Sequence, residues 1–216
     1  MMRLADVPDE DVSYLDELLL EGVRLRLLPA SELREIPPGH LVIWANKNAR
    51  YGIPSAELVE LVRELIGGRD AIEIGAGYGD LGHHLGIRMT DSAIQTTPEM
   101  RVYYATIGAR IIDPPADIER IDGNAAVEKY KPKVVVGSWV TQLYADGDTP
   151  KRIGSSVYGV NEGRIVDAVE CYIHVGNRGS HGQKRILARP HREIVAPFLF
   201  SRSMDPSANI VHVWGS

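Results

Sequence analysis

The sequence predicts an α/β fold organised around a largely parallel sheet, and two stretches indicate it most directly. The first is a short apolar run, Ala71 to Ile74, which leads through a glycine-rich turn into a helix-like segment, Leu81 to Leu85. The second is KVVVG, Lys133 to Gly137, whose β-branched residues without polar alternation are typical of a buried parallel strand. Strand and helix patterns alternate from about Leu58 onward, as expected when helices connect parallel strands.

The composition indicates one soluble globular domain of ordinary size with a small extension. The chain has 216 residues, of which 44% are hydrophobic and 25% charged. No apolar run approaches the ~20 residues that span a bilayer, and the N-terminus lacks the pattern of a secretory signal. The single cysteine, Cys171, excludes an internal disulfide and fits a cytoplasmic location. The net charge of −5 gives no general attraction to nucleic acid, so neither a nucleic-acid nor a membrane partner is favoured.

Residues 1–54 are predicted to form an N-terminal helical extension. Val12 to Leu28 has apolar residues at helical spacing, which predicts a helix packed on the main domain or on a partner subunit. The buried face of this helix would carry Leu15, Leu18, Leu19 and Val23. Prolines and a glycine interrupt the next segment, after which Leu41 to Trp44 could form a short extended piece.

The main domain is expected to span residues 55–216 and to begin with a helix. Ser55 is a suitable N-cap for a helix over Ala56 to Ile66, and Gly67 with Gly68 would end it. The buried stripe of this helix would contain Leu58, Val59, Leu61, Val62 and Leu65.

The turn after Ile74 carries glycines on alternate positions, Gly75, Gly77 and Gly79. Such a turn between a strand and a helix lets a nucleotide lie against bare main chain. A dinucleotide site requires the spacing G-x-G-x-x-G, but here Asp80 stands in the place of the third glycine. Glu73 lies two residues before the first glycine. Two carboxylates would repel a diphosphate, so the turn favours a ligand without phosphate and with positive charge.

The stretch Glu73 to Gly79 resembles the acidic-x-G-x-G-x-G signature of class I S-adenosylmethionine-dependent methyltransferases. The resemblance implies a Rossmann-like fold with a mostly parallel seven-stranded sheet and an antiparallel C-terminal hairpin. It implies S-adenosyl-L-methionine as cofactor, held by Glu73, Gly75, Ala76, Gly77 and Gly79. Asp91 follows the apolar segment Ile87 to Met89 and matches the family's acidic residue that holds the ribose hydroxyls. The alternative is a glycine-rich turn of another α/β protein, with Asp91 as a helix cap.

The family also places an acidic or amide residue after the third strand, where it meets the adenine amino group. Asp117 to Ile121 is predicted as that strand, and Asp122, Gly123 and Asn124 follow it as cofactor-binding candidates. Asp122 could equally cap a helix over Ala125 to Tyr130. The preceding span, residues 92–115, is predicted to be irregular, with a short helix around residues 99–106.

Ser138 and Trp139 follow the strand at Lys133 to Gly137. Ligands of doubly wound sheets lie beyond the carboxyl ends of strands, so both residues should border the pocket. The amino-methylating branch of the family carries an Asn/Asp-Pro-Pro-aromatic motif at this position. This chain departs from the motif, which argues against methylation of the exocyclic amino groups of adenine or cytosine.

The segment WANKNARYGIP, Trp44 to Pro54, combines aromatic and polar residues. In the family, the segment before the first helix often covers the cofactor. The resemblance therefore implies a lid over cofactor or substrate that carries Trp44, Lys47, Asn48 and Tyr51. The alternative is an aromatic anchor at a domain seam.

The C-terminal third is predicted to contain a loop over the site at Tyr144 to Gly159, a helix at Glu162 to Glu170 and a strand at Cys171 to Val175. Cys171 would be a small buried residue and not a nucleophile. A basic cluster follows, which would receive an anionic acceptor or form a solvated face: Arg178, Lys184, Arg185, Arg189 and Arg192. Ile194 to Ser201 and Asn209 to Trp214 are predicted as strands of the final hairpin.

The expected chemistry is methyl transfer to oxygen or nitrogen of a small or medium-sized acceptor, which could be anionic. Because the cofactor carries the activated methyl group, no universal catalytic residue is expected. If a base is needed, the candidates are His174, His181 and His191, and His181 is preferred because it lies in a polar loop after a strand. The sequence does not identify the acceptor or the oligomeric state.

Rival functions remain at this stage. One is a catalytically silent module that keeps the fold and uses its surfaces for assembly, and another is an NAD-dependent enzyme, which Glu73 and Asp80 disfavour. No metal site is predicted, because the adjacent His83 and His84 would point about 100° apart on a helix.

Overall fold

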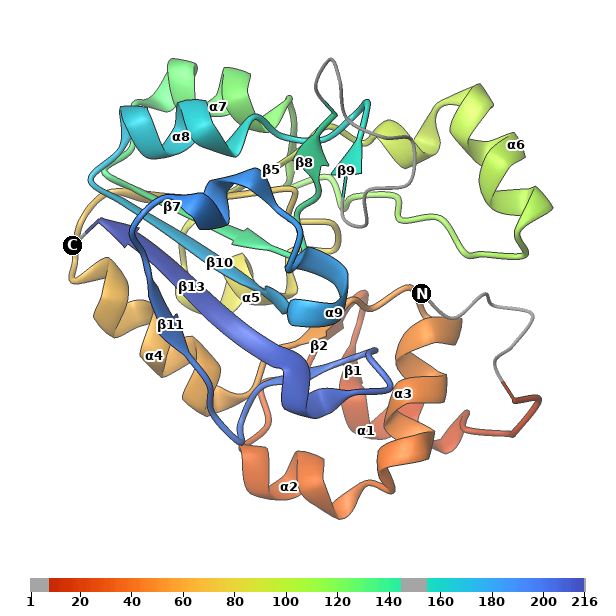
Figure 1. Ribbon diagram of the computed structural model, residues 1–216. Coiled ribbons are helices and arrows are strands. Elements are labelled where there is room, and N and C mark those ends of the chain that lie inside the picture. The colour runs from red at the N-terminus through yellow and green to blue at the C-terminus, as the bar shows by residue number, and fades with distance from the viewer. Residues whose placement is uncertain (1–7, 145–154, 216) are drawn as a thin grey trace.

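A computed structural model describes residues 8–144 and 155–215 of the protein (Figure 1). Its centre is a seven-stranded sheet with the order β11-β13-β10-β7-β4-β5-β6. The strands, in chain order, are β4 (Ala71–Ile74), β5 (Arg88–Asp91), β6 (Glu119–Arg120), β7 (Val134–Ser138), β10 (Cys171–Asn177), β11 (Arg192–Ile194) and β13 (Asn209–Gly215).

The strand directions match the predicted class I methyltransferase fold. β6, β5, β4, β7 and β10 pair in parallel, whereas β13 is antiparallel to both of its neighbours, β10 and β11. The chain runs from β4 outward to β5 and β6 on one side, then returns to β7 and β10 on the other. A ligand crevice is expected at such a reversal, beyond the carboxyl ends of β4 and β7. The Rossmann-like fold and the antiparallel C-terminal hairpin are therefore confirmed.

Helices cover both faces of the sheet (Figure 1). α4 (Ala56–Ile66) and α5 (Asp80–Leu85) lie on one face, and α7 (Gly123–Tyr130) and α8 (Glu162–Ala168) lie on the other. The pleat of β7 divides its side chains between the two cores: Val134 and Val136 pack with the residues of α4 and α5, and Val135 with those of α7 and α8. Because both faces are covered there, β7 is apolar without alternation, as the KVVVG run predicted.

The start of α4 follows its local sequence. Ser55 accepts a hydrogen bond from the backbone N–H of Leu58, and Gly67 ends the helix in the left-handed conformation with φ of 61°. Leu58, Val59 and Val62 are buried in the first core, as predicted.

The N-terminal segment is not one long helix. Its elements are α1 (Tyr14–Leu19), β1 (Leu20–Glu21), β2 (Arg24–Leu25), α2 (Ala30–Glu35), α3 (Pro38–Lys47) and β3 (Gly52–Ile53). The predicted helix from Val12 to Leu28 is wrong beyond Leu19, because Gly22 adopts a left-handed φ of 62° and turns the chain into the β1–β2 hairpin. Leu15 and Leu19 are buried, but Leu18 and Val23 are exposed.

The extended piece predicted for Leu41 to Trp44 is also wrong, because these residues lie within α3. Pro38 occupies the first turn of α3, where no backbone N–H is needed and the ring fixes a helical φ. The proline therefore begins a helix here instead of breaking one. Residues of α1, α2, α3 and β3 form a core of their own around Trp44.

The predicted strand from Ile194 to Ser201 is two separate pieces. β11 ends at Ile194 and pairs with β13 at the sheet edge, whereas β12 (Phe200–Ser201) leaves the sheet and pairs with β3. The tail of the chain thus contacts the N-terminal segment, and Arg202 N donates to Tyr51 O at 3.1 Å.

Short elements complete the described chain: η2 (Ile94–Thr96), α6 (Pro98–Thr106), β8 (Gln142–Leu143), β9 (Ser155–Ser156), α9 (Arg178–His181), η3 (Arg185–Ala188) and η4 (Pro206–Ala208). α6 confirms the short helix predicted within the irregular span. It projects from the body of the molecule and has no buried residue (Figure 1). Within the described residues, no helix has the length and apolar character needed to cross a membrane.

Candidate functional site

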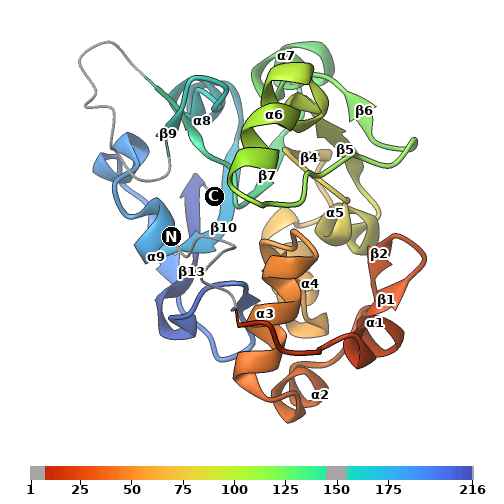
Figure 2. The same cartoon turned by 90° about the vertical axis from the view of Figure 1, so that its right-hand side faces the viewer.

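A cavity of about 380 Å³ lies at the carboxyl ends of β4, β5 and β7. Its walls come from segments that are distant in sequence: residues 49–54, the glycine turn, the span from Asp91 to Tyr104, and residues 138–141. α6 and α3 lie one above the other on this side of the molecule, as Figure 2 shows. Part of the predicted loop over the site, residues 145–154, falls outside the described residues, but Ser156 and Tyr158 of that loop line the cavity.

The glycine turn has the backbone conformation that its sequence requires. Gly75, Gly77 and Gly79 all have left-handed φ values, between 59° and 74°. A Cβ atom at Gly79 would lie 2.6 Å from the sulfur of Met89, so this glycine is required by packing between α5 and the sheet. A Cβ at Gly77 would meet Ile112 at 3.5 Å, which is an ordinary contact. Gly75, Ala76 and Gly77 line the cavity, whereas Gly79 supports the turn from behind.

Glu73 lies beneath the turn and is almost completely buried. Its Oε2 atom accepts a hydrogen bond of 2.9 Å from the backbone N–H of Gly82 in α5. Burial raises the pKa of the Glu73 carboxyl to about 8, and the charges of Asp80 and Asp91 act in the same direction. Glu73 therefore carries a proton at neutral pH.

Asp80 forms an ion pair with Arg50, with 2.6 Å between Oδ2 and Nη1, and it accepts a second hydrogen bond from the backbone N–H of Leu25. Glu73 and Asp80 therefore do not repel a diphosphate as two free carboxylates would. A proton neutralises Glu73, and the Arg50 guanidinium neutralises Asp80. The N–H of Gly82, one of the donors that a diphosphate could use at the start of α5, is occupied by Glu73.

Asp91 ends β5 and lines the cavity. Its Oδ2 atom accepts from Gly77 N at 2.9 Å, and its Oδ1 atom accepts from Ala93 N at 2.7 Å. The carboxylate joins the glycine turn to the end of β5, and each oxygen keeps a lone pair for a ligand.

Asp122, Gly123 and Asn124 do not line the cavity. Asp122 caps α7 by accepting from the backbone N–H groups of Asn124 and Ala125, and Asn124 exchanges two hydrogen bonds with the backbone of Asn161. The structure therefore shows the helix cap that the sequence offered as the alternative to an adenine contact.

Ser138 and Trp139 both line the cavity. Trp139 has a left-handed φ of 59°, which costs a non-glycine residue about 1–2 kcal/mol. Its backbone N–H donates to Val175 O at 2.8 Å, and its ring lies against Tyr51 on one side and His181 on the other, with centroid distances of 6.0 and 5.1 Å. Surrounding contacts hold this backbone in place, as expected of a strained residue at a ligand site.

Of the four residues predicted to form a lid, Trp44, Lys47, Asn48 and Tyr51, only Tyr51 lines the cavity. Trp44 is buried in the N-terminal core and its ring N–H donates to Asp16 at 2.7 Å, which fits the anchor interpretation. Lys47 bonds Glu10 O, and Asn48 accepts from Arg110, both away from the cavity wall.

His181, the preferred base, lies outside the cavity lining. It is buried behind Trp139, and its Nδ1 atom accepts from Asn177 N at 3.1 Å. Burial lowers the pKa of His181 to about 3. His174 is also buried, with its Nε2 atom 2.9 Å from Lys184 Nζ, and burial holds its pKa well below the ordinary value. Neither imidazole is in a position to exchange protons with a ligand in the cavity.

The basic cluster at residues 178–192 does not form a common anion-binding face. Arg178 pairs with Glu193 and Arg189 with Asp167, both at the surface. Lys184 is buried and pairs with Glu162 at 2.7 Å. These cations are distributed over separate partners, so the solvated-face interpretation holds for the arginines and fails for Lys184.

The site predicted from the sequence did not include two parts of the cavity wall, Arg50 and the tyrosines of α6. Arg50 lines the wall, with its guanidinium 3.7 Å from the ring centroid of Tyr78, and its buried Nε has no hydrogen-bond partner among the described residues. Tyr103 and Tyr104 reach the wall from α6. The adjacent aromatic residues Tyr103 and Tyr104 were the sequence signal that could have indicated a contribution of α6 to the cavity. Arg50 lay within the predicted lid segment, but no role was predicted for it.

No protein-family model matches the sequence, and no curated protein is similar to it in sequence. Among solved structures, the chain resembles a tRNA (uracil-54, C5)-methyltransferase from Pyrococcus abyssi in complex with S-adenosyl-L-homocysteine, at 14% identity and a TM-score of 0.37. That match covers 73% of this chain and 36% of the other, so the chain spans about a third of that protein.

Two further similar structures are WbdD and a putative caffeoyl-CoA O-methyltransferase from Staphylococcus aureus. WbdD has 13% identity and a TM-score of 0.42, over 95% of this chain and 47% of that one. The Staphylococcus aureus protein has 13% identity and a TM-score of 0.35, over 95% of this chain and 97% of that one. Methyltransferases are thus among the structural neighbours, and the strand order described above assigns the fold independently of them.

Proposed function

We propose that the protein binds S-adenosyl-L-methionine and transfers its methyl group to an oxygen or nitrogen atom of a small or medium-sized acceptor. One observation carries the proposal: the glycine turn after β4, Asp91 at the end of β5 and Ser138-Trp139 at the end of β7 line a single cavity. That cavity lies where the strand order reverses, which is where sheets of this type bind nucleotides.

Each part of the cofactor has a suitable partner in this cavity. The free lone pairs of Asp91 can accept from the ribose hydroxyls, and the bare main chain at Gly75 and Gly77 allows close approach of the methionine part. The aromatic ring of Trp139 would favour the sulfonium cation.

The cavity wall suggests the class of acceptor. Its aromatic members are Tyr51, Tyr78, Tyr103, Tyr104, Trp139, Tyr158 and Phe200. Rings of this kind favour a planar or apolar acceptor that packs against them, whereas Arg178 and Arg189 of the basic cluster are paired with Glu193 and Asp167. We therefore favour an aromatic acceptor over an anionic one.

The reaction would proceed by in-line displacement. A lone pair of the acceptor attacks the methyl carbon while the carbon–sulfur bond breaks, and the electron pair remains on the sulfur of S-adenosyl-L-homocysteine. The proton of the methylated hydroxyl or amine is released to solvent. No described histidine lines the cavity. Burial and the neighbouring Tyr51 raise the pKa of Tyr104, so this phenol is not a base at neutral pH. Positioning and exclusion of water would supply most of the rate enhancement.

Isothermal titration with S-adenosyl-L-methionine and S-adenosyl-L-homocysteine tests the binding step. We expect Asp91→Asn to weaken binding about 10- to 100-fold, since a hydrogen bond to a charged group contributes about 1.5–3 kcal/mol. Asp122→Asn is the matched control, because Asn caps a helix as well as Asp and residue 122 lies outside the cavity. Absence of binding by the wild type, or equal losses in both variants, would reject the proposed site.

A methyl-transfer assay with labelled cofactor and fractionated cell extract tests catalysis. Acceptor-dependent incorporation of label by the wild type is the expected result. Tight cofactor binding without incorporation into any fraction would favour the catalytically silent module, and binding of NADH in place of S-adenosyl-L-homocysteine would favour the NAD-dependent enzyme.

A further inference from the structure

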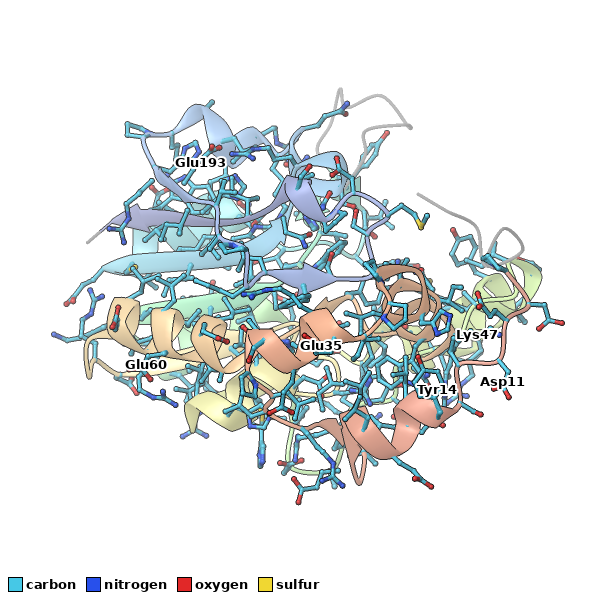
Figure 3. All side chains as sticks on the ribbon, turned by 90° about the horizontal axis from the view of Figure 1, so that it is seen from below. Asp11, Tyr14, Glu35, Lys47, Glu60 and Glu193 are labelled. Carbon is cyan, nitrogen blue, oxygen red and sulfur yellow. The ribbon has the colours of Figure 1, made fainter. Side chains whose placement is uncertain are left out.

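Three metal-ligating side chains converge at the sheet edge formed by β11 and β13, away from the glycine turn. Glu193 on β11 and His212 on β13 are directly paired in the antiparallel register, so their side chains project from the same face. His191 lies two residues before Glu193 and contributes to the same cluster. Figure 3 shows Glu193 on the opposite part of the molecule from Tyr14, Asp11 and Lys47 of the N-terminal segment. None of the three residues lines the cavity.

The two distances from the Glu193 carboxylate to the imidazoles match those between ligands of one metal ion. Nε2 of His212 lies 3.4 Å from Oε1 of Glu193, and Nε2 of His191 lies 3.6 Å from the same oxygen. All the ligand atoms are within 4.8 Å of one another. A tetrahedral ion bound at about 2.1 Å separates its ligands by roughly 3.4 Å. The same distances are long for direct N–H···O hydrogen bonds, which are about 2.7–3.2 Å.

Neighbouring groups leave the required lone pairs available. Nδ1 of His191 lies 2.8 Å from the carbonyl oxygen of Arg189, which can only accept, so Nδ1 carries the hydrogen and Nε2 keeps its lone pair. Arg178 donates to Oε2 of Glu193 at 2.9 Å and leaves Oε1 facing the two imidazoles.

His212 is the buried member of the cluster. Its Nδ1 atom has no hydrogen-bond partner among the described residues. Because no partner fixes the ring hydrogen through Nδ1, Nε2 of His212 can present its lone pair on the side of Glu193.

We propose that His191, Glu193 and His212 bind one divalent transition-metal ion of the zinc type, with water in the remaining position. Two imidazoles and one carboxylate suit Zn²⁺ and Co²⁺ and do not suit Mg²⁺, which prefers oxygen ligands. Arg178, which bonds Glu193, and Lys184, which is paired with Glu162, are the cations that oppose the ion. The metal would join β11 to β13 and fasten the edge of the sheet.

Titration of the untagged, EDTA-treated full chain with Zn²⁺ alone tests the proposal. We expect saturable binding of one ion per chain, no binding of Mg²⁺, and a rise in Tm on addition of Zn²⁺. Co²⁺ should quench the fluorescence of Trp214, whose ring centroid lies 5.3 Å from that of His191 and 5.7 Å from that of His212. Trp214→Phe should lose most of this quenching and still bind the ion.

His191→Ala and Glu193→Gln are the informative variants, because His212 is buried and its replacement could prevent folding. Each should weaken Zn²⁺ binding about 100-fold or more, since even loss of a residue that only supports a ligand costs about 10- to 100-fold. The matched control is His40→Ala, which removes a histidine paired with Glu10 outside any three-donor cluster found in the described part of the chain.

Absence of saturable Zn²⁺ binding by the wild type, or equal affinity in the wild type and both variants, would overturn the proposal. Neither His191→Ala nor Glu193→Gln should change the affinity for S-adenosyl-L-homocysteine, because the cofactor cavity is separate. Failure of the metal site and failure of the proposed function are therefore distinguishable.

Discussion

Arg50 and Asp80 form a buried ion pair, with 2.6 Å between Nη1 and Oδ2, that joins the N-terminal segment to the first turn of α5. The second terminal nitrogen of Arg50 donates to Val23 O at 2.6 Å, so the same guanidinium also holds the β1–β2 turn. The N-terminal segment therefore forms part of the cavity wall. A division of the chain at residue 54 would separate Arg50 and Tyr51 from the rest of the site, and the independence of residues 1–54 as a domain stays a prediction.

Removal of Arg50 should be more damaging than removal of both members of the pair. Arg50→Met leaves the Asp80 carboxylate buried without a counter-ion, and we expect a loss of about 3–5 kcal/mol in the free energy of unfolding. Arg50→Met combined with Asp80→Asn should recover most of the loss, because the amide can still accept from Leu25 N. Urea unfolding measures both, and a double variant no more stable than the single one would contradict this account.

Glu73 should make stability depend on pH. Its pKa of about 8 in the folded protein lies above the ordinary 4.5, so between these values the folded state holds a proton that the unfolded state has lost. The free energy of unfolding should therefore fall as pH rises through this window, by up to about 1.4 kcal/mol per pH unit from this group. Glu73→Gln should lack this contribution.

Urea unfolding of wild type and Glu73→Gln between pH 5 and pH 9 would reveal the effect of Glu73. The difference between the two free energies should change steadily up to about pH 8 and then level off. Parallel curves over the whole range would show that the carboxyl is not held in its protonated form.

The left-handed backbone of Trp139 predicts an unusual order of stability. Trp139→Gly should be more stable than Trp139→Ala by about 1 kcal/mol, because both lose the ring and only glycine relieves the strain at φ of 59°. The control is Glu128 in α7, where the glycine variant should be the less stable by about 1 kcal/mol. Thermal unfolding measures the stability of the four variants. If the alanine variant were the more stable at residue 139 as well as at residue 128, the strain at Trp139 would be absent.

His181→Ala should affect stability and leave catalysis intact. The substitution removes the acceptor of the buried N–H of Asn177, which should cost about 1–3 kcal/mol in the free energy of unfolding. Methyl transfer per folded molecule should stay unchanged at a temperature where circular dichroism shows the variant to be folded. A large fall in turnover with unchanged stability would instead support the base role predicted from sequence.

The parts of the fold that sequence predicted are those with strong local signals. Val134 to Val136 form a strand because the β-branched run leaves no polar face, and Ser55 begins α4 with a hydrogen bond to a residue three positions away. The wrong predictions arise where one residue redirects the chain. Gly22 turns an apolar periodic segment into a hairpin, and Pro38 begins a helix that looked like an interrupted loop.

In the candidate site, too, sequence identified the residues with local signals and missed those brought together by the fold. The glycine turn and Asp91 could be identified because their spacing along the chain is short and fixed. Arg50 finds its partner 30 residues away, and Glu193 meets His212 only through the register of the final hairpin. Asp122 shows a second difficulty: a helix cap and a ligand-binding carboxylate have the same sequence signature before a helix, and here the structure shows the cap.

The pairing of β12 with β3 has a consequence for the order of events during synthesis. Tyr51 and Gly52, on the cavity wall, are held by Arg202 and Ser201, which the ribosome adds about 150 residues later. A nascent chain can form its glycine turn long before this wall is fixed. We therefore expect ribosome-stalled chains that stop before Phe200 to release S-adenosyl-L-homocysteine readily, and chains that include Arg202 outside the exit tunnel to retain it.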